Sequence, residues 1–446
     1  MKPDQQLKLD CGYSWVMSRL ETASPFGSAL ARDPGWYGPG CEDALEAELE
    51  RVALAVERNG DRLTHSLSEF RDIRNSFARQ YNAPMDVVEL FEAKHFLLHL
   101  ERLKEVYDPQ PLPGIELPDL SDMLALLDPT GRRLPAFSVE NVFEPSLERI
   151  RAEKARVEEA LRGGETEELA QRRRDLVREE AVAEREARMR LTAALLREKE
   201  RFFAAMDALG RLDLVLAKAA LARKYGCVKP QVGSTVHMAD MVHPQVAEHL
   251  KGDFMPVSVE LERGTAVVTG ANMGGKSVSL KNVVLNLLLM HTGFFVFAAR
   301  AVSPLFHSVN LIGADGQSVE RGLSSFGAEV KALDGVLKRE RENFFFLGLD
   351  EFARGTNPRE GAALARALVK YLNGMNCMAM MTTHYDGVAD AAVRHYQVAG
   401  LDETARKMDY RLIEADPDAP CPKDALKVCR MLGLDEKLMA CFEENS

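Results

Sequence analysis

The stretch that decides the fold is TAVVTGANMGGKSVSLKNVVL, residues 265–285. Thr265–Thr269 is a short β-prone run, and Gly270–Ser277 matches the pattern G-x-x-x-x-G-K-[ST]. Apolar residues at helical spacing follow from Val278 onward. A strand, a glycine-rich loop and a helix in this order form the context that a phosphate-binding loop requires. We therefore expect an α/β domain of the P-loop NTPase class.

The loop carries the residue types that triphosphate chemistry needs. Backbone N–H groups of a glycine-rich turn can point inward and bind phosphate oxygens, aided by the positive end of the following helix. Lys276 is expected to reach the β- and γ-phosphates of ATP, and the Ser277 hydroxyl to bind Mg²⁺. The predicted nucleotide-binding residues of this stretch are Gly270, Ala271, Asn272, Met273, Gly274, Gly275, Lys276, Ser277 and Val278.

An acidic pair follows the next buried-strand pattern. The run FFFLGL, residues 344–349, ends in Asp350 and Glu351. An aspartate at the C-terminal end of a parallel strand adjacent to the phosphate loop can hold the hydration shell of Mg²⁺, so Asp350 joins Ser277 as a predicted metal-binding residue. Glu351 can orient and deprotonate the attacking water as a general base. Solvated acids at the end of a core strand are the alternative, which the upstream loop disfavours.

A third apolar run, Cys377–Thr382, predicts another buried strand that leads into His384. A histidine at this position could contact the γ-phosphate or the attacking water. A single histidine after a strand is more often structural, but its place after the two preceding motifs favours a role in the site. The predicted catalytic residues are Lys276, Glu351 and His384.

The remaining chain predicts a largely helical region before the ATPase domain. Residues 1–60 are an unassigned segment, irregular apart from one amphipathic helix over 42–56. Residues 61–228 are expected to form an α-helical core or lever domain, and 229–446 the ATPase domain. Within 140–222, sparse apolar positions among balanced charges favour two solvated helices paired along a narrow seam as a projecting antiparallel arm. A charged surface helix or a disordered linker is the alternative.

Composition excludes several classes of protein. The 446 residues are 46% hydrophobic with a net charge of −11, which argues against a globally basic surface but not against a local one. The seven cysteines form no C-x-x-C pair, so neither a zinc site nor a disulfide framework is indicated, and free thiols in a reducing cytoplasm are the simplest account. No apolar run is long enough for a membrane span and no secretory signal is visible, so a cytoplasmic protein with no membrane partner is expected.

Four motifs together resemble one family, the MutS family of ABC-type ATPases. They are GANMGGKS (270–277), GLSSFGAE (322–329), LDEFARGT (349–356) and TTHY (382–385). The resemblance implies an ABC-type ATPase domain that follows a helical lever domain. It also implies a short form, because the first 60 residues have no room for the family's mismatch-reading domain and no nuclease domain follows residue 446.

The resemblance implies further residue roles. Phe254 would stack on adenine, Asn272 would lie near the γ-phosphate, and His384 would be the switch histidine. Ser324 would reach across a homodimer interface to the partner's nucleotide, because the family's ATP sites are composite. Val278 stands where the family usually has threonine, a departure that leaves the phosphate ligands intact.

Two functions from different classes remain open. The first is a homodimeric, Mg²⁺-dependent ATPase whose helical arm clamps mismatched or branched duplex DNA; the candidate phosphate contacts are Arg172, Arg173, Arg174, Arg185, Arg188 and Arg190. The second is a MutS-like ATPase that remodels a protein partner, such as a cobalamin-dependent aminomutase, which the charge-balanced arm and acidic total would suit. A nucleotide-binding protein without turnover is disfavoured because Glu351 is present.

Overall fold

The structure is a computed structural model that describes residues 3–58, 60–78, 83–164, 166–251, 254–270, 275–313, 325–402, 407–415, 435, 438–439 and 441–442. Its contacts group into two compact units. Unit 1 comprises residues 1–21, 34–57 and 218–446, and unit 2 comprises residues 22–33 and 58–217. These units divide the chain differently from the domain boundaries predicted at 60/61 and 228/229, which stay a prediction.

Unit 1 is built around a six-stranded sheet, counted over the described residues, in the order β10-β9-β4-β8-β7-β6. All neighbours in it are parallel except β10 and β9. A smaller sheet has the order β1-β5-β2-β3. The strands are β1 Gln231–Val232, β2 Val236–Met241, β3 Val257–Leu261, β4 Gly264–Thr269, β5 Arg300–Ser303, β6 Ser308–Gly313, β7 Phe345–Asp350, β8 Cys377–Thr382, β9 Arg394–Asp402 and β10 Lys407–Glu414.

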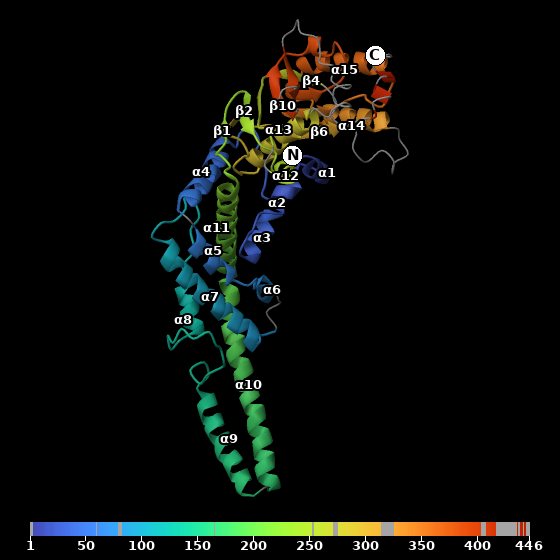
Figure 1. Cartoon of the computed structure of the whole chain (residues 1–446). Coiled ribbons are helices and arrows are strands. Elements are labelled where there is room, and N and C mark those ends of the chain that lie inside the picture. Colours follow the sequence, from blue (N-terminus) through green and yellow to red (C-terminus); the bar gives the residue numbers. More distant parts are fainter. Residues whose placement is uncertain are drawn as a thin grey trace. The chain divides into compact units, whose positions relative to one another are not determined.

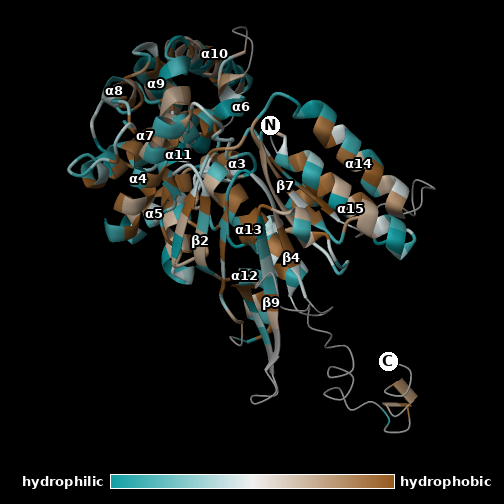
Figure 2. Cartoon of the chain, turned by 90° about the horizontal axis from the view of Figure 1, so that it is seen from above, coloured by the Kyte–Doolittle hydropathy of each residue, from teal (hydrophilic) through white to brown (hydrophobic). Residues whose placement is uncertain are grey.

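The central strands are continuous apolar runs because helices cover both faces of a parallel sheet. Every residue of β4 and β8 is buried. Helix α13, Lys276–His291, is buried nearly all round, whereas α14, Ser325–Arg339, and α15, Pro358–Asn373, alternate polar and apolar residues (Figure 2). The short helices of unit 1 are α1 Gln5–Asp10, α2 Tyr13–Met17, α12 Pro244–His249 and the 3-10 turn Ala389–Ala391.

The segment before residue 60 is more regular than predicted. The expected helix over 42–56 is α4, Glu42–Arg58, but α1, α2 and α3 (Pro25–Ala31) precede it where irregular chain was expected. Short helices of this kind are stabilised by tertiary packing rather than by a periodic pattern, so the sequence carries little signal for them. Asp4 and Ser24 cap α1 and α3 through their side chains.

The described elements of unit 2 are helices. They are α3, α5 Asp61–Ser68, α6 Arg74–Phe77, α7 Val87–Tyr107, α8 Ser121–Leu127, α9 Ser146–Gly163, α10 Glu167–Arg197 and most of α11, Lys199–Tyr225, which passes into unit 1 at Lys218 (Figure 1). Helices α9 and α10 run antiparallel, and their contact is a narrow apolar seam that includes Leu147, Leu176 and Ala183. No helix within the described ranges is both long and apolar enough to cross a bilayer.

Candidate nucleotide-binding site

The phosphate-binding loop begins where β4 ends. Gly270 has φ +129° and Gly275 has φ +82°, backbone conformations that favour glycine. A Cβ on Gly275 would lie 2.7 Å from Cδ1 of Tyr410, so the position also has no room for a side chain. Gly275 caps α13, and the first residue of that helix is Lys276. Ala271, Asn272, Met273 and Gly274 lie outside the described residues.

Lys276 is held inside the loop. Its side chain is 3% exposed, and Nζ donates a hydrogen bond to the carbonyl oxygen of Gly270 at 2.8 Å. The same nitrogen lies 3.9 Å from Oε1 of Glu351. The ammonium group is therefore placed between the start of the loop and the acidic pair, where it can meet a phosphate.

Ser277 and Asp350 meet directly. The Ser277 hydroxyl donates to Oδ1 of Asp350 at 2.7 Å, and the Thr382 hydroxyl donates to the same oxygen at 2.7 Å. The strand that ends in Asp350, β7, is separated from β4 by β8. The carboxylate reaches Ser277 because Asp350 is the last residue of β7 and lies at the same edge of the sheet as Thr382, the last residue of β8.

The donor set at this point suits magnesium. A serine hydroxyl and a carboxylate are hard oxygen ligands, and Mg²⁺ is usually bound through one or two such groups together with substrate phosphates and water. Within the described ranges, no cluster of three or more His, Cys, Asp or Glu side chains forms a separate metal cage. Ser277 and Asp350 are therefore the residues that could hold this ion.

Glu351 lies in a turn of unusual backbone conformation. Its φ is +52°, and its N–H is directed at the carbonyl and hydroxyl oxygens of Thr382, at 3.1 and 3.0 Å. Arg354 donates to Oε2 of Glu351 at 2.7 Å. The carboxylate is 14% exposed and faces Lys276 with its other oxygen.

Lys276, Ser277 and Glu351 border one pocket of about 370 Å³. Phe254, from the segment before β3, lines it together with side chains of α12 and with Tyr410 of β10. The lining residues are Val246, Leu250, Phe254, Val257, Gly275, Lys276, Ser277, Val278, Ser279, Glu351 and Tyr410. The pocket thus joins a polar end beside the loop to an apolar and aromatic wall.

His384 follows β8 and is exposed. Its ring packs against that of Tyr385, with centroids 4.4 Å apart, and it does not line the pocket. Ser324 lies outside the described residues. The structure therefore brings Lys276, Ser277, Asp350, Glu351 and Phe254 together but does not bring His384 into contact with them.

Sequence reasoning missed several residues of the site. Thr382 lies within the quoted TTHY motif, but its hydrogen bond to Asp350 could not be read from spacing. Tyr410 lies in no motif at all and meets Gly275 only because β10 folds back along β9. Arg354 is part of LDEFARGT, and its ion pair with Glu351 spans three residues.

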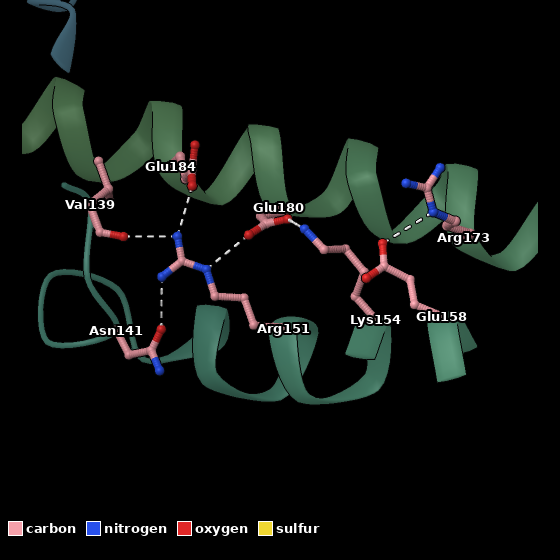
Figure 3. A network of polar contacts seen from close by, with 8 residues as sticks. All are labelled: Val139, Asn141, Arg151, Lys154, Glu158, Arg173, Glu180 and Glu184. Carbon is pink, nitrogen blue, oxygen red and sulfur yellow. Dashed lines mark hydrogen bonds and ion pairs between the residues drawn. The ribbon is translucent and has the colours of Figure 1, made fainter. Parts of the chain in front are cut away.

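The predicted arm has a different electrostatic character from a phosphate-binding surface. Figure 3 shows Arg151 of α9 donating to Glu180 and Glu184 of α10, at 2.8 and 2.7 Å, while Lys154 also pairs with Glu180. Such pairs join the two helices along their length. In these pairs, the positive side chains of the arm are neutralised by carboxylates of the arm itself.

Four of the six arginines predicted to contact phosphate form ion pairs with carboxylates of the arm, some between the helices and some within α10. They pair as Arg172 with Glu153 and Glu179, Arg173 with Glu158, Arg174 with Glu167, and Arg190 with Glu144. Arg188 donates to the carbonyl of Met85 at 3.4 Å, and Arg185 makes no ion pair with a described residue. Phosphate binding by the four paired arginines would have to compete with carboxylates already in contact.

A strand, a glycine-rich loop, a helix beginning with Lys-Ser and a carboxylate that accepts a hydrogen bond from that serine form the arrangement typical of P-loop domains. Residues 266–439 match the family model of MutS domain V. This match confirms the resemblance to the MutS family that the motifs predicted.

Two similar curated proteins, with different names, illustrate the relationship. The chain is 35% identical to endonuclease MutS2 of Thermomicrobium roseum over 259 residues, which cover 54% of this chain and 32% of the relative. It is 31% identical to a DNA mismatch repair protein MutS of Thermus thermophilus over 279 residues, 61% of this chain and 34% of the relative. The chain thus spans about a third of the length of these relatives.

Proposed function

We propose that this chain binds ATP with Mg²⁺, hydrolyses it to ADP and phosphate, and couples the cycle to mismatched or branched duplex DNA in repair or recombination. The observation that carries the proposal is the convergence of Lys276, Ser277 and Glu351 on one pocket, with Asp350 hydrogen-bonded to Ser277 beside it. Each group supplies one requirement of phosphoryl transfer: a phosphate contact, a metal ligand and a base.

The proposed roles follow from the contacts. Lys276 leaves the Gly270 carbonyl and contacts the β- and γ-phosphates. Ser277 and Asp350 hold Mg²⁺, which neutralises charge on the phosphate oxygens when bound. Glu351 orients the attacking water and takes its proton. His384 assists at the γ-phosphate, a role that requires it to approach the pocket when nucleotide binds.

The apolar wall of the pocket suits the base of the nucleotide. Phe254 offers a ring for stacking on adenine, and Val246 and Leu250 supply neighbouring apolar surface. The size of the pocket, about 370 Å³, falls within the usual range for small-molecule sites. Val278 completes the lining where the loop passes into α13.

We further propose a cytoplasmic homodimer in which Ser324 of each copy completes the partner's ATP site. The helical region up to residue 228, with its arm over 140–222, would act as the lever on DNA. The printed names of the relatives, a mismatch repair protein and an endonuclease, support a DNA substrate. They lend no support to the alternative of remodelling an aminomutase.

Two variants test the ATPase half. Lys276→Ala should abolish nucleotide binding, whereas Glu351→Gln should bind nucleotide and lose turnover by about two orders of magnitude or more, as for loss of a general base. Lys370→Ala and Glu360→Gln, exposed changes of the same chemical type on α15, are the matched controls. Equal hydrolysis by the parent and Glu351→Gln would remove the base assignment.

The DNA half is tested by ATPase rate and DNA affinity with mismatched, branched and plain duplexes. We expect the rate to respond to mismatched or branched DNA and the binding constant to fall linearly with salt on a log–log scale. Co-purification with a protein partner and no response to any duplex would overturn the DNA assignment while leaving the ATPase intact.

A further inference from the structure

The turn that carries Glu351 includes a second strained residue. Ala353 has φ +65°, so two non-glycine residues of this short segment adopt the left-handed conformation. Such conformations persist only where neighbouring groups hold them in place. The position of the Glu351 carboxylate therefore depends on what binds the backbone of Ala353.

Two side chains form hydrogen bonds with the backbone of Ala353, one at its N–H and one at its carbonyl oxygen. Its N–H donates to Oε2 of Glu329 at 2.9 Å, and its carbonyl accepts a hydrogen bond from the Tyr385 hydroxyl at 2.8 Å. Glu329 comes from α14 and Tyr385 from the segment after β8, so the turn is bound by two elements distant in sequence. Ala353 itself is fully buried.

Glu329 is an unusual residue for this place. It is only 3% exposed, forms no ion pair with a described residue, and its Oε1 has no hydrogen-bond partner there. Burial raises the pKa of its carboxyl group, while the Ala353 N–H opposes that rise. Burying such a group is unfavourable. We therefore attribute the position of Glu329 to its one described hydrogen bond, which it accepts from the Ala353 N–H.

We propose that Glu329 is a positioning residue for Glu351, holding the 351–353 turn through the Ala353 amide. This inference rests on the proposed ATPase function and deepens it. Glu329 lies on α14, the helix that begins at Ser325, so the position of that helix sets where the Glu329 carboxylate meets the 351–353 turn.

The kinetic test compares Glu329→Ala, which removes the acceptor, with Glu329→Gln, which keeps an acceptor oxygen of the same reach. Glu329→Ala should lower kcat about tenfold or more with the nucleotide Kd little changed, and Glu329→Gln should restore most of the rate. In a Glu351→Gln background, Glu329→Ala should cause no further loss. Leu333→Ala, a core truncation on the same helix, should leave kcat near that of the parent.

An unchanged kcat in Glu329→Ala, an additive loss in the Glu351→Gln background, or an equal loss in Leu333→Ala would each overturn the proposal. Hydrogen exchange of the 351–354 amides, measured without nucleotide, tests it separately from activity. Faster exchange in Glu329→Ala but not in Leu333→Ala is expected, and unchanged exchange would refute the positioning role. Lack of ATP hydrolysis by the parent protein would instead refute the proposed function.

Discussion

His291, the last residue of α13, makes unit 1 sensitive to acid. Its ring is fully buried, with Nδ1 2.6 Å from the carbonyl oxygen of Tyr37 and Nε2 3.3 Å from the backbone nitrogen of Phe306. The Phe306 N–H can only donate, so Nε2 is the acceptor and Nδ1 carries the proton. Trp36 stacks on the ring at 4.3 Å with an interplanar angle of 3°. Protonation of Nε2 would place two hydrogen-bond donors, Nε2–H and the Phe306 N–H, against each other and remove this hydrogen bond.

The magnitude follows from the pKa of His291. Burial lowers it from 6.5 to about 4. Between these values the unfolded chain binds a proton that the folded protein does not, so stability is complete above pH 6.5 and falls as the pH decreases toward 4. At ~1.4 kcal/mol per pH unit the whole loss is about 3 kcal/mol, of which about 2 kcal/mol falls between pH 7 and pH 5.

Urea unfolding at pH 7 and pH 5, followed by tryptophan fluorescence, measures this loss. A Trp15→Phe background leaves Trp36 as the only tryptophan, and it reports on the ring it stacks against. His291→Asn, which keeps a donor toward Tyr37, should show a pH-dependent loss about 2 kcal/mol smaller than the parent. His249→Asn, an exposed change in the same unit, should behave like the parent. The same loss in parent and His291→Asn would refute the reasoning.

Three further outcomes are expected. Gly275→Ala should reduce nucleotide affinity about tenfold or more in a fluorescent-nucleotide titration, because its Cβ would lie 2.7 Å from Tyr410 at a φ of +82°. Leu176→Ala should destabilise the α9–α10 seam by about 2–5 kcal/mol, measured by hydrogen exchange of α9, since the side chain is fully buried. Glu180→Gln, which loses the ion pairs with Arg151 and Lys154, should cost about 1 kcal/mol in the same experiment and less at high salt.

Much of the phosphate site could be predicted because its parts are contiguous in sequence. The strand, loop and helix around Lys276 and Ser277 are one uninterrupted stretch, and the positive φ at Gly275 is a local demand that glycine meets. The strand before Asp350 and the strand before His384 were recognisable as apolar runs, because a parallel sheet covered on both faces needs apolar residues on each side.

In the arm, the sequence pattern predicts the helices but not the partners of their charged side chains. Sparse apolar positions indicated a narrow helical seam, and Leu176 lies in it. The resemblance to a DNA-binding family suggested phosphate contacts at Arg172 and Arg190, and in the structure these side chains meet Glu153, Glu179 and Glu144. Glu153 lies on α9, so its contact with Arg172 of α10 depends on the register between the two helices, which a one-dimensional pattern does not contain.

By itself the sequence determined the family, the phosphate loop and the two acids that follow a buried strand, because each is a local pattern tied to one chemistry. Only the tertiary structure decided that β8 separates β4 from β7, that Thr382 shares the oxygen of Asp350 with Ser277, and that Glu329 binds the turn behind Glu351. These contacts join residues dozens of positions apart. Their geometry comes from strand order and helix packing, which arise only when the whole domain buries its apolar surface together.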